Sequence, residues 1–219
     1  DLDTMFFSTV GLVGIWEFCE ICGLNILNKN DRNKLKEILK MINDELQKQS
    51  LKWNVPFNLE QIPAEQAAIT LAQKDKLFFK NSPYKLYANQ FIPLWIKVDL
   101  FERAKIDGEL DEFFGGGVIS HLNIENKISS NQIKKLINFA ISCGLKHFAL
   151  NPIFSKCPNN HVSYGKFEKC PICNEKIIDY YTRIVGYFTP VSGWTNIRRN
   201  WEFKERKWMK ISIDNFSKN

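Results

Sequence analysis

The segment YYTRIVGYFTPVSGWTNIRRNWEF, residues 180–203, decides how the rest of the chain is interpreted. Within it, Gly186 lies in a run of β-branched and aromatic residues, where packing normally favours a side chain. A glycine in a strand-like run often marks a bulge or a close backbone approach. Glycine also has a chemical property that no other residue shares. Its Cα carries two hydrogens and no side chain, so loss of one hydrogen leaves a planar radical that the adjoining amide and carbonyl groups delocalise. From these residues, both interpretations stay open.

A second notable segment precedes it, CPNNHVSYGKFEKCPIC at residues 157–173. Cys170 and Cys173 have two residues between them, a spacing at which both thiolates reach one tetrahedral ion. Cys157 and His161 offer a second pair across a short linker. Four such ligands leave no position for water, so the pattern predicts a structural site. The imidazole favours zinc over an iron–sulfur cluster.

Composition limits the class of protein. The 219 residues, 44% of them hydrophobic, are enough for one large core or one and a half domains of a soluble protein. The net charge of +6 is scattered along the chain, which favours a solvated surface over a nucleic-acid-binding face and leaves a nucleoside triphosphate as an anionic partner. The clustered cysteines indicate metal binding in a reducing compartment, which we expect to be the cytoplasm. No apolar run approaches the ~20 residues of a membrane span.

The remaining cysteines and histidines receive simpler interpretations. Cys19 and Cys22 form a Cys-x-x-Cys pair within a helical stripe, so we expect both to pack in the core rather than carry out redox chemistry. His121 and His147 fall in predicted strands and are expected to be buried core residues. The N-terminus has no signal-peptide pattern. Since the chain opens at Asp1, we expect a fragment, a split-gene product or a processed segment.

Hydrophobic periodicity and turn residues predict alternating strands and helices, an α/β protein. A strand, a helix and a strand at residues 118–150 predict a parallel pair with a right-handed crossover. The first predicted elements are a buried strand at 5–10 and two helices. One helix has Leu12, Ile15, Trp16, Cys19 and Cys22 on one face, and the other is capped by Asp31 with Leu35, Ile38, Leu39, Ile42 and Leu46 inward.

A strand through Trp53, Val55 and Phe57 follows, then a helix after Pro63 with Ala67, Ala68 and Leu71 inward. The remaining predicted elements are a strand at 84–98, a turn at Asp107 and Gly108, a glycine hinge at 115–117, a strand at 118–124, a helix from Ser130 to Gly144 and a strand at 147–150.

Two strand-to-helix junctions are candidate anion sites. At the first, Gly11 and Gly14 precede a helix, but their spacing fits no dinucleotide or P-loop fingerprint. At the second, Pro63 suits the first turn of a helix and Glu65 favours the positive end of its dipole. Each junction could face a phosphate or could simply be a packed, well-capped helix start.

The segment RIVGY, residues 183–187, resembles the glycyl-radical signature of the anaerobic (class III) ribonucleotide reductases. The cysteine-rich segment before it is similar to the zinc ribbon of that family, which often has four cysteines where this chain has His161. The resemblance covers essentially the whole chain, because further segments follow in the family's order. These are TVGLVGIWE (9–17), NLEQIPAEQ (58–66), YANQF (87–91), the triple glycine at 115–117, Thr189-Pro190-Val191 and Trp194.

This resemblance implies the C-terminal part of a ten-stranded α/β barrel, with Gly186 on a loop in the barrel centre. It divides the chain into a barrel half (1–152), a zinc ribbon-like segment (153–178) and the radical loop with its tail (179–219). It makes Pro63, Ala64, Glu65 and Gln66 the turn that faces the substrate's phosphates. It makes Cys157, His161, Cys170 and Cys173 the ligands of a structural zinc.

The implied activity is the reduction of ribonucleoside triphosphates to deoxyribonucleoside triphosphates for DNA synthesis. A radical-SAM activating enzyme, with S-adenosylmethionine and a 4Fe-4S cluster, would create the radical on Gly186. Formate or a thioredoxin-like dithiol would supply electrons. The thiyl-radical cysteine of the family lies upstream of the TVGLVGIWE-like segment, so we expect this chain to be inactive without the upstream part of the reductase. The family is also commonly a homodimer.

Two alternatives remain from the sequence. The first is a zinc-ribbon module whose basic surface contacts nucleic acid or another partner. The second is a different glycyl radical enzyme, such as a formate-lyase-like acyltransferase, although those enzymes typically lack a cysteine ribbon just before the glycine.

Overall fold

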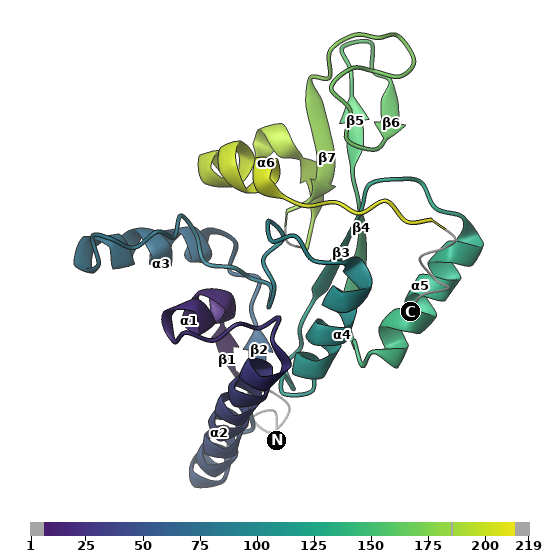
Figure 1. Ribbon diagram of the computed structural model, residues 1–219. Coiled ribbons are helices and arrows are strands. Elements are labelled where there is room, and N and C mark those ends of the chain that lie inside the picture. The colour runs from purple at the N-terminus through teal and green to yellow at the C-terminus, as the bar shows by residue number, and fades with distance from the viewer. Residues whose placement is uncertain (1–6, 185, 213–219) are drawn as a thin grey trace. The chain divides into compact units, whose positions relative to one another are not determined.

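The computed structural model describes residues 7–184 and 186–212, which belong to two compact units (Figure 1). One unit comprises Asp1–Pro93, Lys105–Ser120 and Cys143–Phe148, and the other comprises Leu94–Ala104, His121–Ser142 and Ala149–Asn219. The described strands form two two-stranded sheets and one four-stranded sheet. The predicted α/β class is therefore confirmed, and the described residues form no closed barrel.

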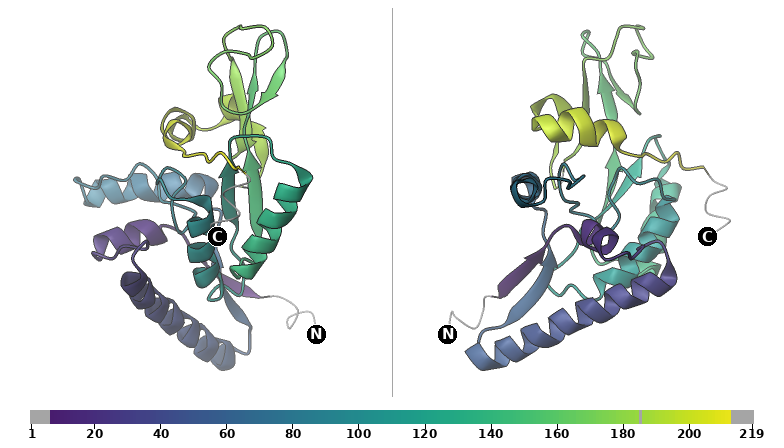
Figure 2. Two further views of the ribbon diagram at one scale, coloured as in Figure 1. Left: turned by 45° about the vertical axis from the view of Figure 1, so that its right-hand side comes forward. Right: turned by 60° about the vertical axis from the view of Figure 1, so that its left-hand side comes forward.

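The first unit is built on a parallel pair of strands. β1 (Ser8–Leu12) pairs with β2 (Phe57–Gln61), with Ser8 opposite Phe57 and Leu12 opposite Gln61. The connection between them contains α1 (Ile15–Ile21) and α2 (Lys29–Trp53), and α2 packs against β2 (Figure 2).

Helix α2 has the predicted amphipathic character. Leu35, Leu39 and Leu46 are buried along one face. The cap is Asn28 rather than the predicted Asp31, because the Asn28 side chain accepts hydrogen bonds from the first free backbone N–H groups of the helix.

Helix α3 (Glu65–Phe78) begins where the sequence predicts, with Glu65 in its first turn. The inward face is only partly the predicted one. Ala68 is buried as predicted, but Ala67 and Leu71 are exposed, and the other buried positions are Ile69 and Ala72.

The second unit contains the metal-like segment and the glycine loop. Its four-stranded antiparallel sheet has the order β6 (Val162–Tyr164), β5 (Phe154–Lys156), β7 (Asp179–Arg183) and β8 (Phe188–Pro190). A core cluster of Ile153, Val191, Trp194 and Phe203 packs beside this sheet.

The remaining elements complete the chain. The strand–helix–strand unit predicted at 118–150 is present, with β3 paired to β4, and Gly144 in the left-handed conformation follows its helix. In chain order, the elements not yet described are α4 (Leu100–Asp111), β3 (Ser120–Ile124), α5 (Ser130–Ser142), β4 (Phe148–Pro152), a 3-10 turn (Val191–Gly193), a π-helical turn (Arg198–Glu202) and α6 (Phe203–Glu205).

Three predicted local structures are wrong. Trp53 ends α2, and the left-handed Asn54 (φ 52°) separates this helix from β2, so no strand runs through Trp53. Residues 84–98 form turns and bends instead of a strand. Pro83 directly precedes that segment and Pro93 lies within it, and proline cannot donate to a strand ladder.

Gly108 is the third case, because it lies inside α4 rather than in a turn. A Cβ at this position would fall 1.9 Å from the carbonyl oxygen of Cys143. The glycine therefore permits a close backbone approach and does not break the helix.

Several burial predictions also need correction. Cys19 is buried as predicted, but Cys22 follows the end of α1 and is exposed. His121 is buried, whereas His147 is exposed. The strand predicted at 5–10 is β1, shifted toward the C-terminus and alternately half-buried and exposed rather than buried. Its first predicted residues, 5 and 6, lie outside the described residues.

None of the described helices combines the length and the apolar character that crossing a membrane requires.

Candidate metal centre and glycine loop

Cys157, His161, Cys170 and Cys173 come together as the sequence predicts. One ligand atom from each residue lies within 4.8 Å of all the others. Sγ of Cys157 lies 3.7 Å from Sγ of Cys173, and Sγ of Cys170 lies 3.7 Å from Nδ1 of His161. Two thiolates on a tetrahedral zinc, at Zn–S distances of about 2.3 Å, are separated by about 3.8 Å. The four residues therefore fit a zinc ion.

Two tight turns present these ligands. Cys157 directly follows β5, and its backbone N–H donates to the carbonyl oxygen of His161 across a turn in which Asn160 is left-handed (φ 60°). In the second turn, the backbone N–H of Asn174 donates to the carbonyl oxygen of Cys170, and Asn174 is itself left-handed (φ 62°). Asparagine tolerates this conformation better than most residues.

The turn backbone also stabilises a thiolate. A hydrogen bond from the backbone N–H of Glu175 is the main cause that lowers the pKa of Cys173, and Nδ2 of Asn159 donates to its Sγ at 3.5 Å. Zinc binds the thiolate form of cysteine, so these donors favour the ligand state. With four protein ligands and no open position, the arrangement suits a structural ion rather than a catalytic one.

Gly186 lies in the turn between β7 and β8 and is exposed. The turn is closed by the backbone N–H of Ile184, which donates to the carbonyl oxygen of Tyr187 at 3.0 Å. Nη1 of Arg183 donates to the carbonyl oxygen of Gly186 at 2.6 Å. Val185 lies outside the described residues.

Packing gives no reason for a glycine at position 186. Leaving aside its two chain neighbours, none of the described residues has an atom within 4 Å of a Cβ built there, and the φ angle lies outside the left-handed region. A close backbone approach at Gly186, which the sequence left open, is therefore not found. An alanine would fit this conformation.

The metal centre and the glycine turn share β7. Asp179, where this strand begins, is paired with Lys156, the neighbour of Cys157. Arg183, where it ends, leads into the glycine turn. Tyr180 packs both against the buried ligands Cys157 and Cys170 and against the core cluster around Trp194. β7 and the packed side chain of Tyr180 therefore connect the metal centre to the base of the glycine turn.

The predicted phosphate turn belongs to the other unit. Pro63 precedes α3, and Ala64 is its N-cap residue in a left-handed conformation (φ 48°). No side chain caps this helix end, while Glu65 and Gln66 are exposed in its first turn.

The sequence reasoning missed two buried groups. Glu17 on α1 is buried and accepts from the backbone N–H of Ala88 at 3.0 and 3.1 Å, and burial raises its pKa to about 7. The second group is the ion pair of Arg206 with Glu202 beside the glycine turn. Its only sequence signal is the four-residue spacing of Arg198, Glu202 and Arg206, which is typical of ordinary helix surface pairs.

Comparison with known proteins gives a consistent result. The family model of the anaerobic ribonucleoside-triphosphate reductases matches residues 2–208. A solved structure described as an anaerobic ribonucleotide reductase is 32% identical, with a TM-score of 0.83, over 94% of this chain and 34% of that chain. The anaerobic ribonucleotide reductase from Thermotoga maritima, with glycerol in its active site, is 34% identical, with a TM-score of 0.75, over 90% and 33% of the two chains.

The Thermotoga maritima enzyme in complex with dATP and CTP is 34% identical, with a TM-score of 0.74, over 89% of this chain and 33% of that chain. This chain thus spans about a third of the length of the solved structures it matches. None of the curated proteins compared with it gives a match. Because the family model matches nearly the whole sequence, the chain belongs to the anaerobic ribonucleoside-triphosphate reductase family.

Proposed function

We propose that this chain is the C-terminal part of an oxygen-sensitive anaerobic ribonucleotide reductase and that Gly186 holds its glycyl radical. The observation that carries the proposal is a glycine without a structural reason inside the RIVGY segment. Gly193 is equally open but lies outside that segment. Gly186 has open space around a would-be Cβ and an ordinary φ angle, so neither packing nor backbone geometry requires glycine there. What remains specific to glycine is the chemistry of its Cα. The RIVGY segment resembles the family's radical signature, which supports the same assignment.

In this proposal, a radical-SAM activating enzyme creates the radical. Its 4Fe-4S cluster would supply the one electron, and S-adenosylmethionine the deoxyadenosyl radical, with methionine as the leaving group. That radical takes one hydrogen atom from Cα of Gly186 and becomes 5′-deoxyadenosine. The unpaired electron stays on Cα, delocalised over the adjoining amide and carbonyl.

The substrate chemistry belongs to the assembled reductase. The radical passes to a cysteine in the upstream part of the enzyme, and the resulting thiyl radical takes the 3′-hydrogen of a ribonucleoside triphosphate. Formate or a thioredoxin-like dithiol supplies the two electrons of the reduction. None of the six cysteines here is assigned the thiyl role, so this chain should reduce nothing without that part. As in the family, a homodimer is the expected assembly, and the barrel is expected only in the whole enzyme.

Pro63, Ala64, Glu65 and Gln66 are proposed to face the substrate's phosphates. The first backbone N–H groups of α3 receive no side-chain cap, and an uncapped helix N-terminus attracts anions. The exposed Glu65 side chain would have to point away from a bound phosphate.

Zinc at Cys157, His161, Cys170 and Cys173 is proposed to be structural. When bound, it would cross-link the two ligand turns and so fix the end of the sheet where β7 begins, opposite the end that bears the glycine turn. The division into a barrel half (1–152), a ribbon (153–178) and a radical loop with its tail (179–219) belongs to the same proposal.

The test is anaerobic activation followed by electron paramagnetic resonance. The chain, together with the upstream part of the reductase, is incubated with the activating enzyme, a reductant and S-adenosylmethionine. The wild type should show a doublet, because one hydrogen remains on Cα, and Gly186→Ala should show no signal while keeping its fold. A wild type that stays silent under conditions that activate a known reductase would contradict the proposal. Salt-sensitive binding of nucleic acid by the silent protein would favour the zinc-ribbon module instead.

A further inference from the structure

The base of the glycine turn is tied to a buried guanidinium. Nη1 of Arg206 donates to the carbonyl oxygen of Arg183 at 2.6 Å, and Nη2 donates to that of Ile184 at 3.0 Å. These are the last residue of β7 and the first residue after it, only two and three positions before Gly186. A side chain distant in sequence therefore fixes the backbone direction in which the chain leaves the sheet.

Arg206 is held in turn by a buried carboxylate. Its Nε donates to Oε1 of Glu202 at 3.0 Å, and Nη1 of Arg198 donates to Oε2 of the same carboxylate at 2.6 Å. All three residues are at most 3% exposed. Buried ion pairs often stabilise a protein less than apolar residues of the same size would, because the charges lose their hydration. A buried pair that also supplies directed donors is better suited to fixing a geometry.

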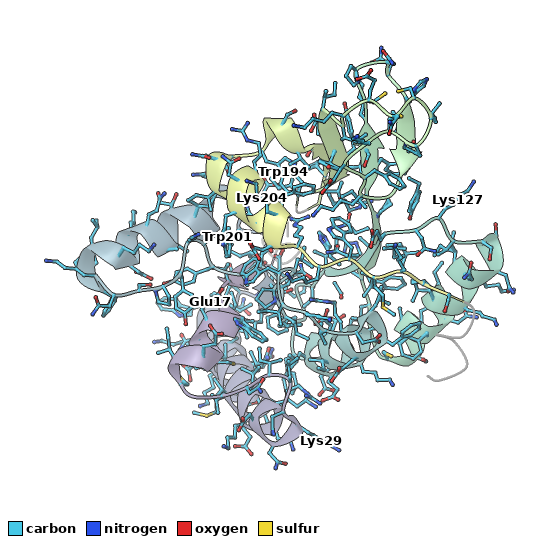
Figure 3. All side chains as sticks on the ribbon, turned by 45° about the horizontal axis from the view of Figure 1, so that its top comes forward. Glu17, Lys29, Lys127, Trp194, Trp201 and Lys204 are labelled. Atoms are coloured by element: carbon cyan, nitrogen blue, oxygen red, sulfur yellow. The ribbon has the colours of Figure 1, made fainter. Side chains whose placement is uncertain are left out.

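β8, the strand that follows the glycine turn, is connected to the Arg206 guanidinium through Trp194. The guanidinium carbon of Arg206 lies 4.7 Å from the centre of the Trp194 ring, and Nε1 of Trp194 donates to Oγ1 of Thr189 at 3.0 Å. Thr189 lies on β8, three residues after Gly186. Figure 3 shows Trp194 beside the C-terminal helical segment that carries Trp201 and Lys204. Glu202 belongs to this segment, and Arg206 directly follows it.

Arg206 and Trp194 thus connect both strands at the base of the turn, while its tip is left open. Gly186 is exposed and has no neighbouring atom within 4 Å of a would-be Cβ. The contacts that fix the base are part-buried and come from two buried side chains, Arg206 and Trp194, whereas Gly186 at the tip is exposed among the described residues. This combination suits a residue that must be presented in one orientation to a reaction partner.

We propose that Arg206 is a positioning residue for radical formation: it fixes the carbonyls of Arg183 and Ile184 and thereby sets the direction in which Cα of Gly186 is presented. This inference rests on the proposed radical function of Gly186. Transfer of a hydrogen atom requires a short, aligned approach of the two reacting atoms. A turn whose base varies in conformation should therefore slow radical formation sharply. The zinc ligands are separate side chains, so zinc binding should not depend on Arg206.

The test compares Arg206→Lys with Arg199→Lys in the chain assembled with the upstream part of the reductase. Lysine keeps the positive charge for Glu202 but cannot donate to two carbonyls from a rigid plane. Arg199 is a matched control, because it is an exposed arginine on the helical segment that precedes Arg206. Its Nη1 also donates to a backbone carbonyl, that of Ser192, at 2.9 Å. The measured quantities are the glycyl radical formed per chain and its rate of formation at saturating activating enzyme.

We expect Arg206→Lys to lower that saturating rate on the order of 10–100-fold, with zinc content unchanged and the fold retained at a lower unfolding temperature, because buried hydrogen bonds are lost. We expect Arg199→Lys to match the wild type. A folded, zinc-loaded Arg206→Lys that activates at the wild-type rate would overturn the inference while leaving the proposed function intact. A wild type without any radical would instead overturn the proposed function.

A second variant decides the case if Arg206→Lys fails to fold. Trp194→Phe keeps an aromatic ring for Arg206 but removes the N–H that reaches Thr189. It should lower the saturating rate by a smaller factor with zinc retained. A rate equal to that of the wild type would overturn the inference in that case.

Discussion

Gly108 approaches Cys143 so closely that a Cβ on the glycine would fall 1.9 Å from the cysteine's carbonyl oxygen. This is a glycine that packing requires, in the interior of α4. Gly186 is the opposite case, with no atom near its would-be Cβ. The two glycines therefore predict opposite results when each is replaced by alanine.

Gly108→Ala should destabilise the fold. Alanine gains about 1 kcal/mol of helix propensity over glycine, but overpacking typically costs about 1–3 kcal/mol, and here the obstacle is backbone rather than a movable side chain. We expect a net loss of free energy of unfolding, measured in urea. Gly193→Ala is the control, because nothing lies within 4 Å of its would-be Cβ and its φ is ordinary. Equal stability of the two variants would show that the close approach is not real.

The metal centre predicts one zinc per chain. Replacing both Cys170 and Cys173 by serine should remove zinc and lower the unfolding temperature, because two of the four ligands are lost. Cys143→Ser, which changes a cysteine outside the cluster, should keep the metal. Elemental analysis of the purified proteins measures this directly. Zinc that persists in the double variant would rule out the assigned ligands.

His161, the ligand that departs from the family's pattern of four cysteines, gives a second test of the metal centre. His161→Cys should retain zinc, because a thiolate is an equally suitable ligand and the backbone turn around Asn160 is unchanged. His161→Ala leaves three thiolates and should bind zinc more weakly than the wild type. Competition with a chelator measures both affinities. An alanine variant as tight as the wild type would remove His161 from the ligand set.

Glu17 predicts a pH dependence of stability. Burial raises its pKa from the usual 4.5 to about 7 in the folded protein. Between these values, the folded state binds the proton and the unfolded state does not, so the free energy of unfolding falls as pH rises from about 4.5 to about 7. At about 1.4 kcal/mol per pKa unit, the loss is on the order of 3 kcal/mol.

Glu17→Gln should remove this part of the pH dependence. The amide oxygen still accepts from the backbone N–H of Ala88 and carries no charge to bury. The variant should therefore be more stable than the wild type above pH 7 and similar to it below pH 4.5. Glu37→Gln, at an exposed position on α2, is the control. Parallel stability curves for the wild type and Glu17→Gln would contradict the shifted pKa.

The sequence was sufficient where a residue type carries a strong local constraint. Ligand spacing placed Cys157, His161, Cys170 and Cys173 in one cluster, and hydrophobic periodicity found the helices α2 and α5. The division of the chain into three functional parts stays a prediction, as does the substrate role of the turn at 63–66.

The sequence was insufficient where tertiary contacts determine the local structure. Gly108 reads as a turn residue, and only the position of Cys143 explains why it lies in a helix. The aromatic run at 84–98 has strand propensity, yet it forms turns and bends with Phe91 and Ile92 buried. Arg206 has no local signal of its role, because its partners are backbone carbonyls more than twenty residues away.

Oxygen provides the most direct test of the central claim that Gly186 is the radical residue. After anaerobic activation, brief exposure to air should cleave the backbone at the residue that holds the radical, and mass spectrometry of the fragments identifies that residue. The wild type and Gly193→Ala should both be cleaved at Gly186, and Gly186→Ala should remain intact. An activated wild type that stays whole, or a Gly186→Ala chain that is cleaved like the wild type, would contradict the account.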